Sequence, residues 1–163
     1  MRYSTQDTLP SDPSIVSGYY YNETYGIMDT GTTLMYVPYG LFSTLLPVIV
    51  QGHSEAVYYS SSGAYTATCD TSTYQSVFMY INGSYYEMTP DTWLYPYDPA
   101  NNICLIGIMD SGSSMFLVGD VFLKNYYSIW DDDNSQMSLS PHIYSSATVT
   151  VGSAPTAYLD INA

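Results

Sequence analysis

The stretch that decides the fold is Ile27-Met28-Asp29-Thr30-Gly31-Thr32-Thr33. Its two leading apolar residues predict a short strand that points inward and ends at Asp29. Gly31 permits a tight turn and a close approach of the backbone, and Thr30 and Thr32 offer hydroxyls beside the carboxylate. A carboxylate that accepts several hydrogen bonds is held in place and kept ionisable. Taken alone, the triplet Asp-Thr-Gly also fits an Asx-type turn in any β protein.

Short apolar runs separated by turn residues extend outward from this stretch. The predicted strands are Ile27-Met28, Leu34–Val37, Val77–Ile81, Tyr85–Met88, Leu105–Met109, Met115–Val118, Ser128–Trp130 and Met137–Leu139. Asn82-Gly83, between two of these runs, is the strongest short hairpin signal, and Asp131–Asn134 is a polar turn between two others. Strands of this length and spacing predict an all-β domain.

Two segments are predicted to form short helices. Gly40–Val50 carries apolar residues at near-helical spacing, although Pro47 limits its length. Asp120–Tyr127 begins with an aspartate that suits an N-cap. We expect residues 1–18 to form an irregular arm, residues 19–144 to form one domain, and residues 145–163 to form a mobile tail.

The charge of the chain excludes one class of function. Of 163 residues, 15 are acidic and only two, Arg2 and Lys124, are lysine or arginine, so the net charge is −13. Because lysine and arginine side chains are needed to bind phosphates, nucleic-acid binding is excluded and anionic membranes are repelled. Repulsion among the carboxylates falls near pH 4, so the composition suits an acidic compartment. No apolar run approaches the length of about 18 residues that a transmembrane helix needs.

Several features point to the secretory route. Cys69 and Cys104 are an even pair, which suggests a disulfide in a secreted or vacuolar protein, with two free core thiols as the alternative. Asn22 and Asn82 each begin a glycosylation sequon. No signal peptide is visible, because Met1 is followed by polar residues. We therefore expect the N-terminal part of the protein to be missing from this sequence.

The sequence offers no convincing metal site. His53 and His142 lie in polar, turn-like stretches and are interpreted as surface residues, and no cysteine or histidine spacing supports zinc. Asp131-Asp132-Asp133 lacks the glycine and the distal glutamate of a calcium-binding EF-hand loop, so a solvated turn is favoured. We expect neither a metal nor a cofactor.

The residues around Asp29 and three further features together resemble the pepsin-like aspartic proteases. The apolar-apolar-Asp-Thr-Gly-Thr-Thr stretch is similar to the active-site motif of that family. Downstream, Phe116–Asp131 resembles the family's C-terminal signature and Phe78–Gly83 resembles its hairpin. Cys69 and Cys104 fall where the disulfide of the family's C-terminal lobe falls. The resemblance extends over residues 26–140 and implies that residues 19–144 form a single pepsin-like C-terminal lobe.

The resemblance implies a role for each residue of the motif. Asp29 matches the catalytic aspartate of the second lobe. Thr30 matches the residue whose hydroxyl helps to lock the two active-site loops together, and Gly31 matches the glycine whose N–H steadies the carboxylate. Thr32 matches the hydroxyl that bonds the outer oxygen of the aspartate. The positions that match substrate-binding residues are Ile27, Thr32 and Thr33.

A second stretch imitates the motif. Residues 108–114 read apolar-apolar-Asp-Ser-Gly-Ser-Ser, so Asp110 could be mistaken for the second aspartate of a pair. We reject this interpretation because the chain between Asp29 and Asp110 is too short for a second lobe. The stretch also lies just before Gly119, which matches the glycine that packs under the active-site loop in the family.

The resemblance implies the C-terminal half of an aspartic endopeptidase that hydrolyses peptide bonds at acidic pH. Its chemistry uses a pair of aspartates, of which this chain supplies only Asp29, so the implied partners are a peptide or protein substrate and a missing N-terminal lobe. The implied location is secreted or vacuolar. Two alternatives stay open: an inactive lobe or binding module, and a homodimer that joins two copies of Asp29 as retroviral proteases do.

Overall fold

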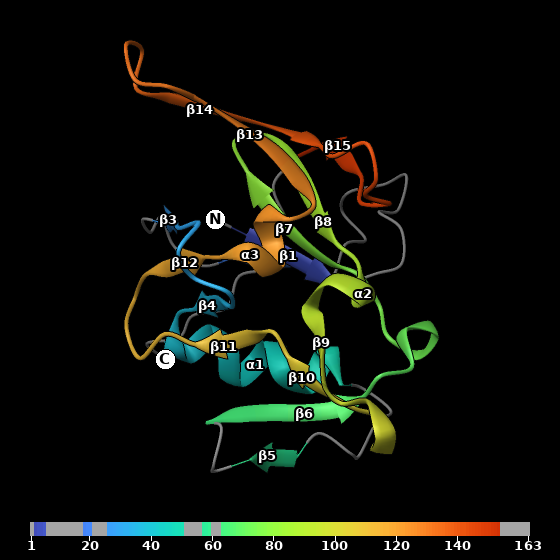
Figure 1. Cartoon of the computed structure of the whole chain (residues 1–163). Helices are drawn as coiled ribbons and strands as arrows, with labels where there is room; N and C mark the ends of the chain where they lie inside the picture. Colours follow the sequence, from blue (N-terminus) through green and yellow to red (C-terminus); the bar gives the residue numbers. More distant parts are fainter. Residues whose placement is uncertain (1, 6–17, 21–25, 51–56, 60–62, 154–163) are drawn as a thin grey trace.

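The strands that the structure describes are arranged in three sheets and a two-stranded ribbon (Figure 1). The structure is a computed structural model that describes residues 2–5, 18–20, 26–50, 57–59 and 63–153. Short strands dominate it and the helices are few and short, so the predicted all-β fold is confirmed. No helix of the described ranges is both long and apolar enough to cross a membrane.

The largest sheet is antiparallel and has five strands. Its order is β15 (Val149–Val151), β8 (Ser84–Met88), β7 (Val77–Ile81), β1 (Arg2–Thr5) and β2 (Gly18–Tyr20). The predicted hairpin joins β7 to β8, and its turn residues Asn82 and Gly83 have φ angles of 44° and 85°. Asparagine and glycine are the residues that tolerate this left-handed backbone, so the hairpin signal is confirmed.

Two strands of this sheet lie where the sequence predicts irregular or mobile chain. β1 pairs with β7 inside the expected arm of residues 1–18, and β15 pairs with β8 inside the expected tail of residues 145–163. The structure differs from those predictions at these two strands. The physical reason is that both gain their backbone hydrogen bonds from the edges of the hairpin, which a local sequence pattern does not reveal.

The other two sheets have four strands each. One has the order β5 (Val57–Tyr59), β6 (Ala64–Thr68), β10 (Ile103–Ile106) and β9 (Leu94–Asp98), and the other has the order β11 (Ile108–Asp110), β4 (Met35–Val37), β12 (Phe116–Val118) and β3 (Gly26–Met28). The predicted strand Leu105–Met109 is divided between them at Gly107. A Cβ atom on Gly107 would lie 2.9 Å from the carbonyl oxygen of Trp93, so this close approach requires glycine.

The ribbon consists of β13 (Tyr126–Asp131) and β14 (Gln136–Pro141), which flank the predicted polar turn. It projects away from the body of the molecule at the top of Figure 1. Within the described strands, β13 and β14 pair only with each other. Both outer edges of the ribbon therefore carry backbone groups that no described strand satisfies.

The helices agree only partly with the predictions. α1 (Tyr39–Ile49) contains Pro47 and confirms the first predicted helix. α3 (Asp120–Leu123) is much shorter than predicted, because the chain from Tyr126 onward is drawn into β13. The N-cap of α3 is Gly119 rather than Asp120. The structure also contains α2 (Pro90–Trp93) and two 3-10 turns, η2 (Thr71–Thr73) and η3 (Pro99–Asn101).

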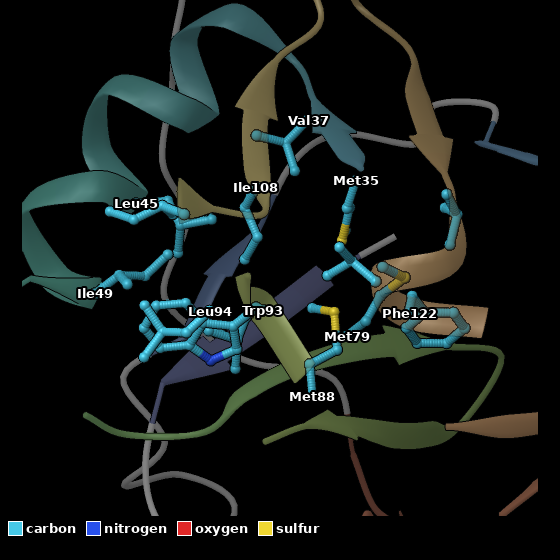
Figure 2. Close-up of a cluster of buried hydrophobic side chains, with 14 of the residues drawn as sticks. Met35, Val37, Leu45, Ile49, Met79, Met88, Trp93, Leu94, Ile108 and Phe122 are labelled. Atoms are coloured by element: carbon cyan, nitrogen blue, oxygen red, sulfur yellow. The ribbon is translucent and has the colours of Figure 1, made fainter. Parts of the chain in front are cut away.

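The core lies where α1, the sheet of β4 and β11, and the β7–β8 hairpin meet, with α2 and α3 closing it (Figure 2). Trp93 is fully buried at its centre, and its indole ring packs edge-on against the ring of Tyr74. Figure 2 labels ten of the buried side chains: Met35, Val37, Leu45, Ile49, Met79, Met88, Trp93, Leu94, Ile108 and Phe122. Burial of a large apolar side chain contributes about 1.5–3 kcal/mol, so this cluster dominates the stability of the domain.

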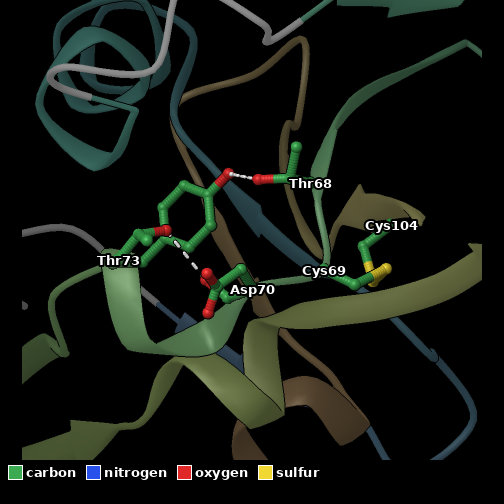
Figure 3. Close-up of a disulfide and its surroundings, with 6 residues drawn as sticks. Thr68, Cys69, Asp70, Thr73 and Cys104 are labelled. Atoms are coloured by element: carbon green, nitrogen blue, oxygen red, sulfur yellow. Dashed lines mark hydrogen bonds between the residues drawn. A yellow bond between two sulfur atoms is a disulfide. The ribbon is translucent and has the colours of Figure 1, made fainter.

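A disulfide joins Cys69 to Cys104 and confirms the expected pairing (Figure 3). It ties the residue after β6 to the neighbouring strand β10, with the two Cα atoms 5.1 Å apart. Beside it, Asp70 caps the turn η2 by accepting a hydrogen bond from the Ser72 N–H at 3.1 Å. The loop that the disulfide closes therefore contains a turn, η2, which is stabilised by a residue of the same loop.

Candidate active site

Asp29 lies at the carboxyl end of β3, where the chain leaves the sheet. Its N–H donates to the carbonyl of Val118 at 2.9 Å, which continues the parallel pairing of β3 with β12 by one residue. Its carbonyl accepts the N–H of Thr32 at 3.2 Å and closes a tight turn. The backbone on both sides of the carboxylate is therefore fixed by the sheet and by the turn.

Two hydrogen bonds hold the carboxylate of Asp29. The N–H of Gly31 donates to Oδ1 at 2.8 Å, and the hydroxyl of Thr32 donates to Oδ2 at 2.7 Å. The Thr32 bond, followed by the Gly31 bond, lowers the pKa of Asp29 below its ordinary value of 3.8, against a smaller opposing effect of burial. The side chain is partly exposed. The loop thus presents an ionised carboxylate in a fixed orientation.

The segment after β12 packs directly behind this loop. The N–H of Asp120 donates to the carbonyl of Thr32 at 2.8 Å, and the N–H of Val121 donates to the carbonyl of Thr33 at 3.0 Å. A Cβ atom on Gly119 would overlap the carbonyl oxygens of Thr32 and Leu34. The expectation that Gly119 lies under the Asp29 loop is therefore confirmed, and the reason is that only glycine fits there.

Residues 108–114, which resemble the Asp29 motif in sequence, form a similar turn in a different place. The N–H of Gly112 donates to Oδ1 of Asp110 at 2.8 Å, as Gly31 does to Asp29. In the sheet order β11-β4-β12-β3, β11 is parallel to β4, β4 is antiparallel to β12, and β12 is parallel to β3. β11 and β3 therefore run in opposite directions on opposite edges. Asp110 and Asp29 lie at opposite ends of the sheet and do not form a pair.

The remaining predicted site residues lie around Asp29 or elsewhere on the surface. Ile27, on β3, is 47% exposed, and Thr30 and Thr33 are exposed in the loop itself. The sequon residue Asn82 is exposed in the turn of the β7–β8 hairpin. The sequon at Asn22 and the histidine at position 53 lie outside the described residues.

The described residues hold no group of three or more histidine, cysteine, aspartate or glutamate side chains that could bind a metal. In the predicted polar turn, the carboxylate of Asp131 accepts hydrogen bonds from the side-chain amide of Asn134 at 2.8 Å and from its N–H at 3.1 Å. These bonds lower the pKa of Asp131. The turn is therefore closed by its own residues.

One open pocket lies apart from the predicted site residues. It has a volume of about 360 Å³ and is lined by Asp91, Thr92, Lys124, Asn125, His142, Tyr144, Ser145 and Ser146. Burial lowers the pKa of Lys124, while the charges of Asp91 and Asp120 act in the opposite direction. Sequence reasoning does not find this pocket because three separate segments of the chain form it.

Known proteins resemble this chain over most of its length. The sequence model of the eukaryotic aspartyl proteases matches residues 12–142. The chain is 32% identical over 125 residues to gastricsin of Rattus norvegicus, 30% identical over 118 residues to an acid protease of Saccharomycopsis fibuligera, and 28% identical over 116 residues to rhizopuspepsin of Rhizopus chinensis. The alignments cover 71–72% of this chain but only 28–30% of these relatives. The chain thus spans less than a third of their length.

Proposed function

The chain belongs to the eukaryotic aspartyl protease family, and on that premise we propose that it supplies the C-terminal lobe of an endopeptidase that hydrolyses peptide bonds at acidic pH. The observation that carries this proposal is the carboxylate of Asp29, partly exposed and held by Gly31 and Thr32. Asp29 is the proposed catalytic residue. Thr30 would help to fix the loop against its counterpart, and Ile27, Thr32 and Thr33 would contact the substrate.

The proposed chemistry requires a second carboxylate beside Asp29. Aspartic proteases are the standard example of two carboxyl groups that share one proton, because two like charges a few ångströms apart do not both ionise readily. The ionised member removes a proton from a bound water while the water oxygen bonds to the carbonyl carbon. The protonated member gives its proton to the carbonyl oxygen. The tetrahedral intermediate then collapses, the C–N bond breaks, and the leaving nitrogen takes up a proton.

The hydrogen bonds of Asp29 suit the ionised member of such a pair. Both bonds that it accepts stabilise the carboxylate over the carboxylic acid, which is why its pKa is lowered in this chain. Once a second carboxylate lies beside Asp29, the two pKa values belong to the pair. Asp29 by itself supplies a base without the acid.

We infer that the second carboxylate comes from an N-terminal lobe. The relatives are more than three times as long as the aligned part of this chain. The ribbon of β13 and β14 supports a missing partner, because Tyr127, Ile129 and Trp130 are 65%, 56% and 54% exposed on it. A projecting ribbon with open edges and exposed apolar side chains is suited to pairing with further strands.

A secretory location is part of the proposal. The Cys69–Cys104 disulfide supports it, because disulfides persist in oxidising compartments. The exposed position of Asn82 in a hairpin turn is compatible with a glycan there. The acidic composition suits a protein that works at low pH, where repulsion among its carboxylates is reduced.

Complementation tests the proposal. The chain is mixed with an N-terminal lobe from a related aspartic protease at pH 3–5, and hydrolysis of a fluorogenic peptide is measured. Loss of a catalytic acid or base costs about 100-fold or more, so we expect Asp29→Asn to abolish most of the activity. Asp110→Asn is the matched control, because it changes the same side chain in the same turn, and it is expected to retain activity.

Three outcomes would reject the proposal. Hydrolysis that does not change on Asp29→Asn removes the catalytic role from this residue. Activity of the chain alone that rises with the square of its concentration supports a homodimer in place of an N-terminal lobe. Absence of hydrolysis with several lobes that each assemble with the chain would favour a binding module.

A further inference from the structure

Residues 145–153, here called the C-terminal strap, lie beyond the part of the chain that matches the protease family. Its strand β15 adds to the free edge of β8, with Val149 opposite Tyr86. The N–H of Gly152 donates to the carbonyl of Gly83 at 3.1 Å. The hydroxyl of Tyr85 donates to the carbonyl of Ser153 at 2.7 Å. From Thr148 to Ser153 the strap is thus fastened to the β7–β8 hairpin.

A buried carboxylate fastens the strap at Thr148. Glu87, on β8, is only 7% exposed. Its Oε2 accepts the N–H of Thr148 at 2.9 Å and the Thr148 hydroxyl at 2.6 Å, and its Oε1 accepts the hydroxyl of Ser76 at 2.7 Å. Because this carboxylate is buried, each of these hydrogen bonds offsets part of the cost of removing it from water.

The same cluster contacts β13 through Tyr126. The Tyr126 hydroxyl donates to the carbonyl of Glu87 at 2.6 Å and lies 3.3 Å from the carbonyl of Thr148. Burial raises the pKa of Tyr126, and the nearby charge of Glu87 raises it further. Its ring packs against the ring of Phe122 in α3, with the centroids 4.9 Å apart. The strap, β8 and α3 therefore meet at one tyrosine.

α3 connects this cluster to the candidate active site. The helix has only four residues, and a helix of one turn is not stable by itself. Its position depends on the packing of Phe122 and on the two hydrogen bonds that its first residues, Asp120 and Val121, donate to the Asp29 loop. One of these bonds ends on the carbonyl of Thr32, whose hydroxyl holds the carboxylate of Asp29.

We propose that the C-terminal strap and Glu87 are positioning elements for Asp29. By holding Tyr126 they fix α3, and α3 in turn keeps the Thr32 hydroxyl on the Asp29 carboxylate. The relevance to catalysis rests on the proposed function, but the coupling itself is a property of this chain and is measurable without activity. Neither Glu87 nor Thr148 touches the carboxylate of Asp29, so both act through other residues.

The test measures the pKa of Asp29 in the full chain by carbon-13 NMR of its carboxyl group. Thr148→Val keeps the shape of the side chain but removes one donor to Glu87. We expect it to loosen the strap and to raise the pKa of Asp29 toward 3.8. Thr150→Val is the matched control, because it makes the same change at an exposed position of β15 and is expected to leave the pKa unchanged.

A second pair of variants changes the acceptor, Glu87, in case Thr148→Val loosens the strap too little to be measured. One of the two should keep the strap in place and the other should release it. In Glu87→Gln the amide oxygen can accept from Thr148 while the amide NH₂ donates to the Ser76 hydroxyl, so the fastening and the pKa of Asp29 should both be retained. Glu87→Met fills similar space without any acceptor and should raise the pKa of Asp29. Amide hydrogen exchange of β8 and β15 reports independently whether the strap has loosened.

The proposal is overturned if Thr148→Val and Glu87→Met accelerate exchange in the strap while the pKa of Asp29 stays unchanged. It is also overturned if neither variant loosens the strap, because Glu87 is then not its fastening. These outcomes do not affect the protease proposal, which the Asp29→Asn complementation decides. Conversely, a shift of the Asp29 pKa in an inactive complex would keep the coupling and reject the catalytic role.

Discussion

Replacing Gly119 by alanine places a methyl group where the Asp29 loop leaves no space. The added Cβ would overlap the carbonyl oxygens of Thr32 and Leu34 and would lie 2.9 Å from the carbonyl carbon of Thr32. All three are backbone atoms, so no side-chain rotation relieves the overlap. The segment after β12 must move away from the loop, and the bonds from Asp120 and Val121 lengthen or break.

The magnitude follows from these contacts. Two backbone hydrogen bonds contribute about 1 kcal/mol each to stability, and overpacking of a tight site costs about 1–3 kcal/mol. The free energy of unfolding should therefore fall by about 3–5 kcal/mol for Gly119→Ala. This is a large fraction of the roughly 5–15 kcal/mol that stabilises a typical domain.

Gly112→Ala is the matched control. Gly112 has a φ of 62° and no atom within 4 Å of its Cβ position, so alanine there costs only the left-handed backbone, about 1–2 kcal/mol. Urea denaturation followed by the fluorescence of the buried Trp93 measures both variants. A difference of about 2 kcal/mol corresponds to a midpoint lower by about 1 M urea in Gly119→Ala. Equal midpoints for the two variants would refute the packing argument.

Three further predictions concern single groups. Thr32→Val removes the main cause of the lowered pKa of Asp29, so carboxyl NMR should show that pKa rising toward 3.8. A lowered pKa means that ionised Asp29 stabilises the fold above its unfolded pKa, and that this stabilisation is lost as the pH falls. The variant has less of this stabilisation to lose, so its stability should fall less than that of the wild type on acidification. A pKa that stays unchanged would place the cause elsewhere. Replacing Cys69 and Cys104 by serine opens a loop of 35 residues and should reduce stability by about 4 kcal/mol in urea denaturation; an unchanged midpoint would mean that the bond does not form. After secretion from yeast, Asn82→Gln should lose the mass of one glycan, and an unchanged mass would show that this sequon is not used.

Elements with a local signal were predictable from the sequence. The hairpin at Asn82-Gly83 was predictable because few residues accept a left-handed backbone, and such residues stand out. The turn after Asp29 was predictable because its hydrogen bonds join residues two and three positions apart. The same local character explains why Asp110 imitates it, since an Asx turn forms wherever its residues occur.

Elements that depend on distant partners were not predictable. β1 and β15 form because β7 and β8 offer edges for pairing, and the residues of β1 and β15 themselves do not indicate a strand. α3 ends early because β13 captures the chain from Tyr126 onward. Glu87 reads as an ordinary exposed glutamate of a hairpin strand, yet it is buried by a segment that starts about 60 residues later.

The sequence alone determined the family, the all-β class and the residues of the Asp29 loop, because these follow from short-range patterns and from a motif whose order can be compared with other proteins. Only the tertiary structure decided that a Cβ atom at position 119 has no space behind that loop, that Asp110 lies at the opposite end of the sheet, and that the C-terminal strap is fastened to Glu87. These are relations between residues far apart in the chain. Packing and long-range strand pairing set them, and a linear pattern does not record which distant segments will meet.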